Sequence, residues 1–274
     1  MSVRVPATSA NLGPGFDVLG LALTLHVEMG VAGVDEMPEG ARVAEDTHPG
    51  QVAFLRAGGS GQVWVTSRIP AARGMGFSGA VRVGGVICAE VQRLGASWSK
   101  ADSRALELGA ELEGHADNVA PSVHGGVVIV SDGLVVPVPM AMDAAFVMWV
   151  PDFSTSTNES RRAIGSTIAL GDAVFNIART AMLVTAFQSG DVSLLRDATK
   201  DKIHQDIRLA ASPACREALD AGLAAGAWGG WLSGSGPTVA LMCEPARAAT
   251  IAASLPAGGH AKVLALDLDG ATVL

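Results

Sequence analysis

The chain has 274 residues, of which 49% are hydrophobic and 17% are charged, and its formal net charge is −8. This composition excludes a disordered protein, because there is enough apolar surface to form a buried core. The negative charge argues against a nucleic-acid partner, since a phosphate backbone is bound mainly by lysine and arginine. A length prior of about 100–200 residues per domain favours two domains, and we place the boundary near residue 142.

The three cysteines, Cys88, Cys215 and Cys243, lie far apart, with neither a CxxC pair nor a histidine cluster at metal-ligand spacing. A disulfide framework or a zinc site is therefore not expected. The N-terminus lacks the apolar segment of a signal peptide, and no run approaches the roughly 18–20 apolar residues of a membrane span. We expect a soluble, cytoplasmic protein without a membrane partner.

In chain order, the first notable segment is a glycine-rich stretch from Pro6 to Gly20, and the second, from Val34 to Gly61, is rich in turn formers. For the second we expect a loop with at most one short helix. Further along, β-prone runs predict strands and apolar residues at helical spacing predict helices. The predicted strands are 63–68, 125–130, 144–150, 238–243 and 262–268, and the predicted helices are 78–94, 100–113, 172–188, 213–225 and 245–254. Because strands and helices do not alternate strictly, the fold class is α+β.

The segment from Pro70 to Gly79 joins a predicted strand to a predicted helix and contains Gly74 and Gly76. Free N–H groups and the positive end of the helix dipole attract anions, and glycine lets the backbone approach a ligand closely. Phosphate is the expected ligand. The loop is not a Walker motif, because no Gly-Lys-Ser/Thr follows, and it lacks the full spacing of a dinucleotide fingerprint. Taken alone, the pattern equally suits a tight strand-to-helix turn.

Five segments carry a resemblance to a known family. The opening VPATSANLGPGFDVLG occupies residues 5–20, and it is followed by EGHADNVAP (113–121), STNESR (156–161), HQDIR (204–208) and WLSGSGPT (231–238). In this order they resemble the motifs of the GHMP superfamily of small-molecule kinases, and most of all its homoserine kinase branch. One glycine-rich motif can arise by chance, whereas five in sequence across most of the chain are specific.

The resemblance implies a two-domain fold. A ribosomal-protein-S5-like N-terminal domain (1–142) would bind ATP, and a ferredoxin-like C-terminal domain (143–274) would contribute substrate-binding residues. The implied reaction transfers the γ-phosphoryl group of ATP to the side-chain hydroxyl of L-homoserine, which yields O-phospho-L-homoserine for threonine biosynthesis. ATP and Mg²⁺ are the implied cofactors, and family habit suggests a homodimer.

On the nucleotide side, the resemblance assigns the ATP phosphates to Arg73, Gly74, Met75, Gly76, Phe77, Ser78 and Gly79. Ser78 and Glu113 are the implied magnesium ligands, and both count with Asp17 as catalytic. One hydroxyl, one carboxylate and the phosphates suit magnesium, which prefers oxygen ligands. Glu111 takes the role of Glu113 if the register shifts, and without the resemblance Glu113 is an ordinary residue at a helix end.

On the substrate side, the resemblance implies contacts from Asn11, Asp17, His115, Asn118, Arg161, Arg208 and Gly234. An arginine fork makes two parallel hydrogen bonds to a carboxylate, so Arg161 and Arg208 would select an amino acid over a neutral alcohol. Arg162 is adjacent to Arg161, so the motif match could also assign the carboxylate contact to Arg162. We interpret Asp17 as an orienting residue first and a base second, because positioning and charge neutralisation can carry phosphoryl transfer.

The phosphate loop departs from the usual Gly-Leu-Gly-Ser-Ser-Ala, since Phe77 replaces a serine and Gly79 replaces the alanine. We expect ATP binding to persist with weaker phosphate contacts, and Gly79 to cost roughly 0.5–1 kcal/mol at the helix start. The stretch between residues 34 and 62 is shorter than in typical members, and the family's adenine-side segment has no clear counterpart, with His48–Ala53 as its candidate remnant. The nucleotide preference is therefore open. Two alternatives remain: a catalytically silent ligand-binding protein that kept the amino acid pocket, and a GHMP kinase for another small alcohol.

Overall fold

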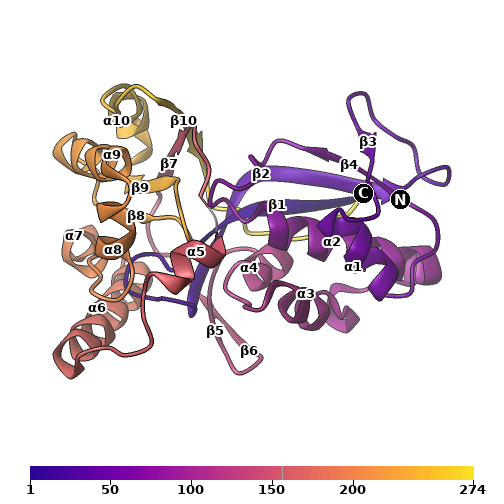
Figure 1. Cartoon of the computed structure of the whole chain (residues 1–274), viewed down its shortest axis with the longest axis horizontal. Helices are drawn as coiled ribbons and strands as arrows, with labels where there is room; N and C mark the ends of the chain where they lie inside the picture. The colour runs from indigo at the N-terminus through magenta and orange to yellow at the C-terminus, as the bar shows by residue number, and fades with distance from the viewer. Residues whose placement is uncertain (156) are drawn as a thin grey trace.

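The computed structural model describes residues 1–155 and 157–274, and contains two antiparallel sheets with helices packed against them (Figure 1). The predicted α+β class is confirmed. The first sheet contains β1 (Val3–Ala10), β2 (Leu19–Val31), β3 (Arg42–Val43), β4 (Val63–Ser67), β5 (Val127–Ser131), β6 (Leu134–Val138) and β11 (Thr272–Val273). Its order is β11-β1-β2-β4-β3, and β5 pairs with both β2 and β6.

The second sheet has the order β10-β7-β9-β8. Its strands are β7 (Ala145–Pro151), β8 (Gly229–Leu232), β9 (Val239–Cys243) and β10 (Gly259–Leu264). β7 is buried throughout because successive side chains enter two different cores. Phe146, Met148 and Val150 join the large core shared with the first sheet, whereas Val147 and Trp149 join a smaller core on the opposite face.

Four helices, α1 (Pro49–Arg56), α2 (Phe77–Leu94), α3 (Ala105–Glu113) and α4 (Val119–His124), lie together beside the first sheet (Figure 1). α2 is the central one and packs on β1 and β2. α1 approaches it closely because Gly85 has no side chain, and a Cβ there would lie 2.1 Å from the carbonyl oxygen of Gly50. α2 is thereby fixed, and its N-terminus points to the site described below.

The predicted helix at 100–113 is wrong in its first part. The chain instead forms the short 3₁₀ turns η1 (Gly95–Ser97) and η2 (Lys100–Asp102) before α3 begins. The carboxylate of Glu90 accepts hydrogen bonds from Trp98 Nε1 (3.0 Å), Ser103 Oγ (2.7 Å) and the backbone N–H of Arg104 (2.8 Å). Because these bonds hold the chain around one buried acceptor, a continuous helix cannot form there.

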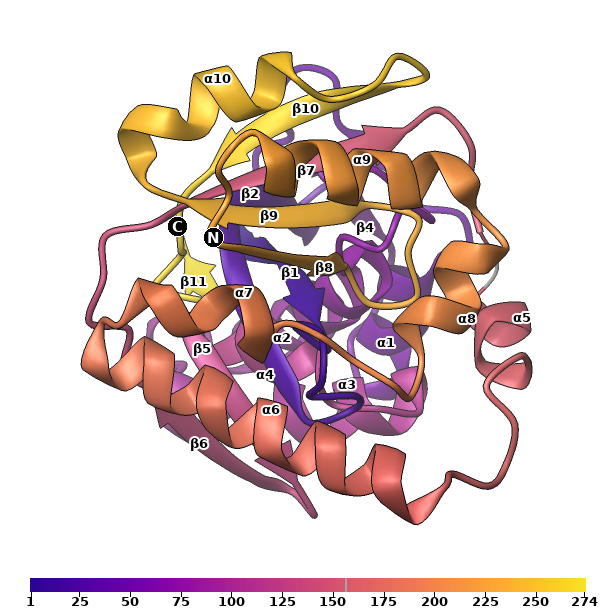
Figure 2. The ribbon, with the colours of Figure 1, turned by 90° about the vertical axis from the view of Figure 1, so that its left-hand side faces the viewer.

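The C-terminal half supplies the remaining helices. They are α5 (Thr157–Arg162), α6 (Leu170–Ser189), α7 (Leu195–Ala198), α8 (Gln205–Ala210), α9 (Pro213–Ala224) and α10 (Ala248–Ala253), with 3₁₀ turns η3 (Val192–Leu194) and η4 (Pro245–Arg247). α9 and α10 cover the outer face of the second sheet (Figure 2). The other face of that sheet is turned to the large core, so the two sheets share one interior.

The sequence did not predict β1, β2, β3, β6, β8 or β11, and one predicted strand was placed too far along the chain. β1 and β2 were not predicted, because the glycines of residues 5–20 indicated a loop, whereas only residues 11–18 connect the two strands. β10 ends at Leu264 rather than continuing to 268, because the chain leaves the second sheet there and Leu266 forms a single bridge with Leu23. β11 then pairs with β1, so the C-terminus returns to the first sheet. The domain boundary near residue 142 stays a prediction.

By length and composition, one described helix, α6, qualifies as a membrane span, whereas the sequence analysis expected none. α6 packs on the protein through Leu183 and Phe187, and Asn176 makes buried hydrogen bonds. Its outer face exposes Leu170 and Ile177. Because helices that pack in soluble cores meet the same criteria, this finding is weak support for a membrane segment.

Candidate active site

A cavity of about 340 Å³ lies at the N-terminus of α2. Of the predicted site residues, those that line it are Asn11, Asp17, Arg73, Gly74, Met75, Gly76, Phe77, Ser78, Glu113, His115, Asn118, Arg161, Arg208 and Gly234. Gly79 is the exception, since it lies within the first turn of α2 beside Asn118. Residues from six separate segments therefore meet in one place, although their individual roles stay predictions.

The phosphate loop has a backbone that glycine permits at two positions. Gly74 and Gly76 have φ angles of 72° and 69°. A Cβ at Gly76 would lie 1.8 Å from Thr8 Oγ1, and one at Gly74 would lie 2.5 Å from the carbonyl oxygen of Ser233. No described side chain caps the N-terminus of α2. The first-turn N–H groups, which have no acceptor within the helix, are therefore available to an anion.

Ser78 and Glu113 are hydrogen-bonded to each other at the mouth of this loop. Ser78 Oγ donates to Glu113 Oε2 at 2.8 Å, because the C-terminus of α3 lies beside the first turn of α2. Arg82, one turn further along α2, donates through Nη1 to both Ser78 Oγ and Glu113 Oε2. The oxygens that the resemblance assigns to magnesium thus hold a guanidinium. Arg82 was missed, although its spacing of four from Ser78 was a usable signal.

The side chains of Arg73 and Phe77 point away from the loop's concave face. Arg73 Nε and Nη2 donate to the carbonyl oxygens of Pro151 and Asp152, each at 3.1 Å, which ties the loop to the end of β7. The Phe77 ring packs on the large core and meets the His48 ring edge-on at 6.1 Å. Phe77 therefore forms a wall between this cavity and a second one, and does not fill the first.

Asp17 and Arg161 form a bidentate ion pair across the cavity. The two N···O distances are 2.8 and 2.6 Å. The loop holds Asp17 in place, because its backbone N–H donates to Asn11 Oδ1 at 3.0 Å while Asn11 Nδ2 donates to Gly234 O at 3.0 Å. The hydrogen bond to Asp17 raises the pKa of Arg161 above its usual value. The pair is about one-third exposed, so a ligand can reach it.

Arg208 is the buried cation of the site, with 7% of its surface exposed. Its Nη1 donates to Gly234 O at 2.9 Å and to His204 Nδ1 at 3.1 Å. Burial lowers the pKa of Arg208 to about 10, and the positive charge of Arg161 contributes to that shift. The ring of Phe16 lies 5.6 Å from this guanidinium and 5.5 Å from that of Arg161. Both cations therefore lie within cation–π range of one aromatic ring.

Comparisons with known proteins agree with this geometry. Family models described as GHMP kinases N terminal domain and GHMP kinases C terminal match residues 42–126 and 183–261. A homoserine kinase of Desulfitobacterium hafniense is 35% identical, with 99% of each chain covered. One from Thermus thermophilus is 38% identical, with 96% of this chain and 94% of the relative covered.

The chain belongs to the homoserine kinase family of GHMP kinases. The resemblance seen in the five motifs is thereby confirmed. A crystal structure of homoserine kinase from Cytophaga hutchinsonii matches with a TM-score of 0.85 at 28% identity, covering 100% of this chain and 97% of that one. A mevalonate kinase structure matches with a TM-score of 0.73 at 11% identity, which shows the shared fold alone. Membership of a kinase family implies ATP as a substrate.

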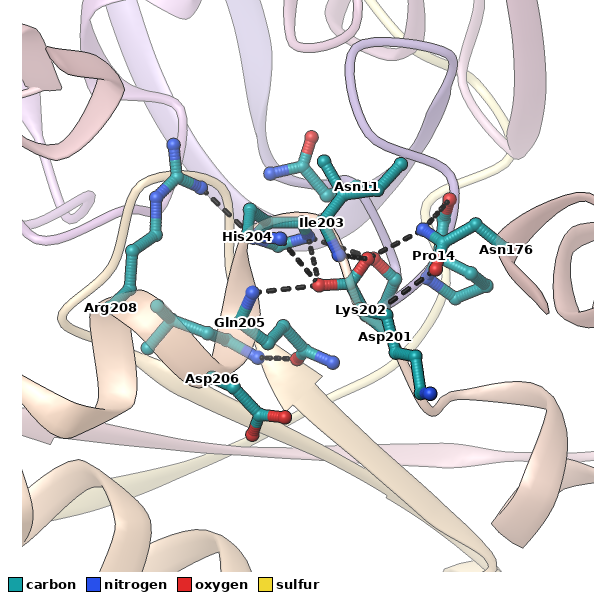
Figure 3. A network of polar contacts seen from close by, with 12 residues as sticks. Asn11, Pro14, Asn176, Asp201, Lys202, Ile203, His204, Gln205, Asp206 and Arg208 are labelled. Atoms are coloured by element: carbon teal, nitrogen blue, oxygen red, sulfur yellow. Dashed lines mark hydrogen bonds and ion pairs between the residues drawn. The ribbon is translucent and has the colours of Figure 1, made fainter. Parts of the chain in front are cut away.

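Within this homoserine kinase fold, a buried network centred on Asp201 positions Arg208 (Figure 3). The Asp201 carboxylate accepts from the backbone N–H groups of Ile203 (3.1 Å), His204 (2.7 Å) and Gln205 (2.7 Å) at the start of α8. It also accepts from Asn176 Nδ2 at 2.6 Å. One carboxylate thus replaces the missing acceptors of a helix N-terminus and joins α8 to α6.

His204 connects this network to the substrate loop. Its Nε2 donates to Gly13 O at 2.8 Å, which leaves Nδ1 as the acceptor for Arg208. Burial lowers the pKa of His204, and the nearby charge of Arg208 adds to the effect. Asn176 also donates to Pro14 O at 3.2 Å. A neutral His204 and Asn176 therefore hold the 11–18 loop at two points.

His115 and Asn118 occupy the floor of the cavity. His115 Nδ1 lies 2.7 Å from Asp117 Oδ1, and Thr8 Oγ1 donates to Asn118 Oδ1 at 2.8 Å. Burial lowers the pKa of His115, but the hydrogen bond and charge of Asp117, together with the charge of Glu113, outweigh burial and raise it. The family motif at 113–121 therefore places an imidazole with cationic tendency beside the phosphate loop.

Sequence reasoning missed several residues of the homoserine kinase site. Phe16 and Asp117 lie inside the recognised motifs, so their positions were available and only their roles were overlooked. Asp201 and Asn176 carry no motif signal. The remaining unpredicted residues that line the cavity are Ala72, Thr155, Ser235 and Gly236. Ser156, the first residue of the STNESR motif, lies outside the described residues.

Proposed function

We propose that this protein transfers the γ-phosphoryl group of ATP to the side-chain hydroxyl of L-homoserine. The observation that carries the proposal is that an uncapped helix N-terminus and an Asp17–Arg161–Arg208 cluster line the same cavity. The first suits the phosphates of a nucleotide and the second suits a zwitterionic amino acid. Family membership supports the same reaction.

The amino acid would bind by dividing the ion pair between Asp17 and Arg161. The substrate ammonium takes the Asp17 carboxylate, and the substrate carboxylate takes Arg161 together with the buried guanidinium of Arg208. Asp17 and Arg161 each keep an opposite charge throughout, so binding leaves neither of them unpaired, and Arg208 gains one. A substrate that lacks either charge leaves one partner uncompensated, and this supplies selectivity.

For the nucleotide, we propose that its base and ribose occupy the second cavity, of about 600 Å³, on the far side of Phe77. Its walls include most residues of the 40–49 segment and Val65–Ser67, so the predicted remnant His48–Ala53 contributes His48 and Pro49. The phosphates would then cross from this cavity to the N-terminus of α2, where Phe77 is the residue common to both spaces.

In the reaction, the homoserine hydroxyl oxygen would form the new bond to the γ-phosphorus while the bond from that phosphorus to the bridging oxygen breaks. The hydroxyl proton would pass to an oxygen of the transferred phosphoryl group, and ADP would leave. Magnesium that accompanies ATP neutralises part of the phosphate charge. The chain contributes alignment, since the arginines fix the carboxylate end, Asp17 fixes the ammonium, and the α2 amides fix the phosphates. Positioning of this kind is the main contribution of proteins to phosphoryl transfer.

The test is ADP release by the purified protein with a panel of alcohols. We expect L-homoserine to give a kcat/KM at least about 100-fold above that of 4-hydroxybutyrate, which lacks the ammonium, and 3-amino-1-propanol, which lacks the carboxylate. A preference for mevalonate or a sugar would indicate the GHMP kinase of another alcohol. Homoserine binding by calorimetry without ADP release would indicate the silent ligand-binding protein.

The predicted homodimer and cytoplasmic location are separate proposals. The first comes from the family resemblance, and the second from the expectation, based on the sequence, of neither an apolar leader nor a membrane span. Neither takes part in the chemistry above. Sedimentation velocity over a range of concentrations tests the first, because a stable dimer keeps one sedimentation coefficient on dilution. Fractionation of cells that express the chain tests the second.

A further inference from the structure

We propose that Arg82 is a built-in cation that takes the place of a protein-bound metal ion between Ser78 and Glu113. The proposal rests on the proposed function, because it concerns how the same cavity receives the ATP phosphates. It adds a positioning residue that lies outside the recognised motifs. It also means that the protein would need magnesium only as the MgATP complex, without a metal ion bound by the protein itself.

The helix geometry places Arg82 at this position. Side chains on a helix lean toward its N-terminus, so a residue four positions after Ser78 extends back over the first turn of α2. The Nη1 of Arg82 contacts Ser78 Oγ and also contacts Glu113 Oε2 at 2.5 Å. The Ser78 hydroxyl in turn donates a hydrogen bond to Glu113 Oε2. The three side chains form a closed set in which each group contacts the other two.

This set of three side chains leaves few oxygen lone pairs to bind a metal ion. A magnesium ligand must offer an oxygen lone pair, yet the Ser78 hydroxyl already accepts from Arg82, and the oxygen of Glu113 nearest to it accepts from both. A divalent ion at the same oxygens would lie beside a guanidinium and be repelled by it. The donor set therefore fits an arginine better than a metal held by the protein alone.

The charge of Arg82 has a clear use when ATP arrives. Without a cation, the Glu113 carboxylate would face the incoming phosphates at the one place where the helix amides attract them. Arg82 neutralises that carboxylate, and its guanidinium cannot lose its proton in a protein. Among the described residues, the hydrogen bonds of its guanidinium use Nη1 alone, and both end on the Ser78–Glu113 pair. Magnesium then enters only as part of the substrate, bound to ATP.

Manganese binding to the nucleotide-free protein tests the proposal directly. Free Mn²⁺ is measured by electron paramagnetic resonance for wild type, Arg82→Met, Arg82→Lys and Arg93→Met, the last being a matched control at the far end of the same helix. We expect no submillimolar Mn²⁺ site at Ser78 and Glu113 in wild type, Arg82→Lys or Arg93→Met. We expect Arg82→Met to gain one, and Glu113→Gln in that background to abolish it.

The result that overturns the proposal is a Mn²⁺ site in wild type that Glu113→Gln removes, or no gain in a folded Arg82→Met. Circular dichroism checks that each variant is folded. If Arg82→Met does not fold, wild type and Arg82→Lys decide, because a Glu113-dependent site in either contradicts the proposal. These measurements need no turnover, so they stand apart from the proposed reaction.

The activator profile gives a second readout. At saturating MgATP, we expect the wild-type rate to change less than about two-fold as free Mg²⁺ is raised, and the Arg82→Met rate to rise by about 10-fold or more. Equal profiles would contradict the proposal. Absence of turnover in wild type with every alcohol would instead refute the proposed function, which keeps the two failures distinguishable.

Discussion

The two walls of the cavity are built in different ways. The wall that contains Arg208, called the substrate wall, depends on buried side chains. Arg208 is held by His204 and by the carbonyl of Gly234, and the Asp201 carboxylate accepts a hydrogen bond from the backbone N–H of His204. The nucleotide wall depends on backbone, because Gly74–Ser78 is shaped by positive φ angles and by the start of α2. Under the proposed function, the amino acid would therefore meet charges that are fixed in place, whereas the phosphates would meet amides.

This difference predicts where each wall is sensitive. On the substrate wall, removal of one side chain leaves a buried partner unsatisfied, so the effect should be large and confined to the amino acid. On the nucleotide wall, substitution cannot remove the amides, so backbone shape should matter there in addition to the side chains of Ser78, Arg82 and Glu113. The following experiments separate these two kinds of dependence.

The largest effect should come from Arg208→Ala. We expect the KM for L-homoserine to rise by about 100-fold or more, which corresponds to about 2–5 kcal/mol. The reason is that the substrate carboxylate loses the buried guanidinium with which it would pair. The KM for MgATP should change little. Ser78→Ala should do the reverse and raise the KM for MgATP more than the KM for L-homoserine. Arg216→Ala is the control, since Arg216 pairs with Asp206 on the surface. Steady-state kinetics with both substrates varied would reveal parallel losses, which would contradict the division of the cavity.

Gly76→Ala should have the next largest effect, on the other wall. The left-handed backbone costs an L-residue about 1–2 kcal/mol, and the new Cβ would overlap Thr8 Oγ1. We expect a lower melting temperature and a KM for MgATP raised by about 10-fold, with the homoserine KM nearly unchanged. Thermal unfolding and kinetics measure both. An undisturbed MgATP KM would mean that the loop's shape does not set phosphate binding.

The two site histidines should give stability opposite pH dependences. His204 has a lowered pKa, so its contribution is lost as pH falls below the usual histidine value of about 6.5, where the unfolded chain takes up the proton first. His115 has a raised pKa, so its contribution is full below about 6.5 and is lost as pH rises through the folded-state pKa. Each slope is at most about 1.4 kcal/mol per pH unit for one proton.

Urea unfolding of His204→Gln and His115→Gln from acidic to mildly alkaline pH measures these slopes. Relative to wild type, the first substitution should reduce the loss of stability at acidic pH, and the second should reduce the loss on the alkaline side. The prediction is wrong if both substitutions change the pH dependence of the unfolding free energy in the same direction. The wild-type profile alone is not informative, because the two contributions partly cancel.

The smallest effect should be a gain. Gly79→Ala adds a helix-favouring residue three positions from Gly76, and its Cβ would meet Asn118 Cβ at an ordinary 3.5 Å. We expect unfolding to become more costly by about 0.5–1 kcal/mol, with MgATP kinetics unchanged within error. Denaturant unfolding measures this. A destabilised variant would show that the first turn of α2 needs the flexibility of glycine, as the phosphate loop does.

Prediction from sequence succeeded best where neighbouring residues decide the outcome. The strand near 63–68, the loop with Gly74 and Gly76, and the helix that follows are all present, because glycine sterics and apolar spacing act over a few residues. The first motif indicated a loop and concealed two strands, since β1 and β2 are defined by pairing with each other. The broken helix before α3 was missed because its cause, Glu90, lies in another helix.

The sequence by itself therefore determined the family, the glycine-rich loop and most of the residues around the cavity. Only the tertiary structure decided which partners they have: Asp17 with Arg161 across 144 positions, Arg82 with Glu113 across 31, and Arg73 with Pro151 across 78. The physical reason is the distance along the chain over which each interaction acts. Backbone conformation follows from sterics between near neighbours, whereas the partner of a charge depends on how distant segments pack and on which oxygens that packing leaves within reach.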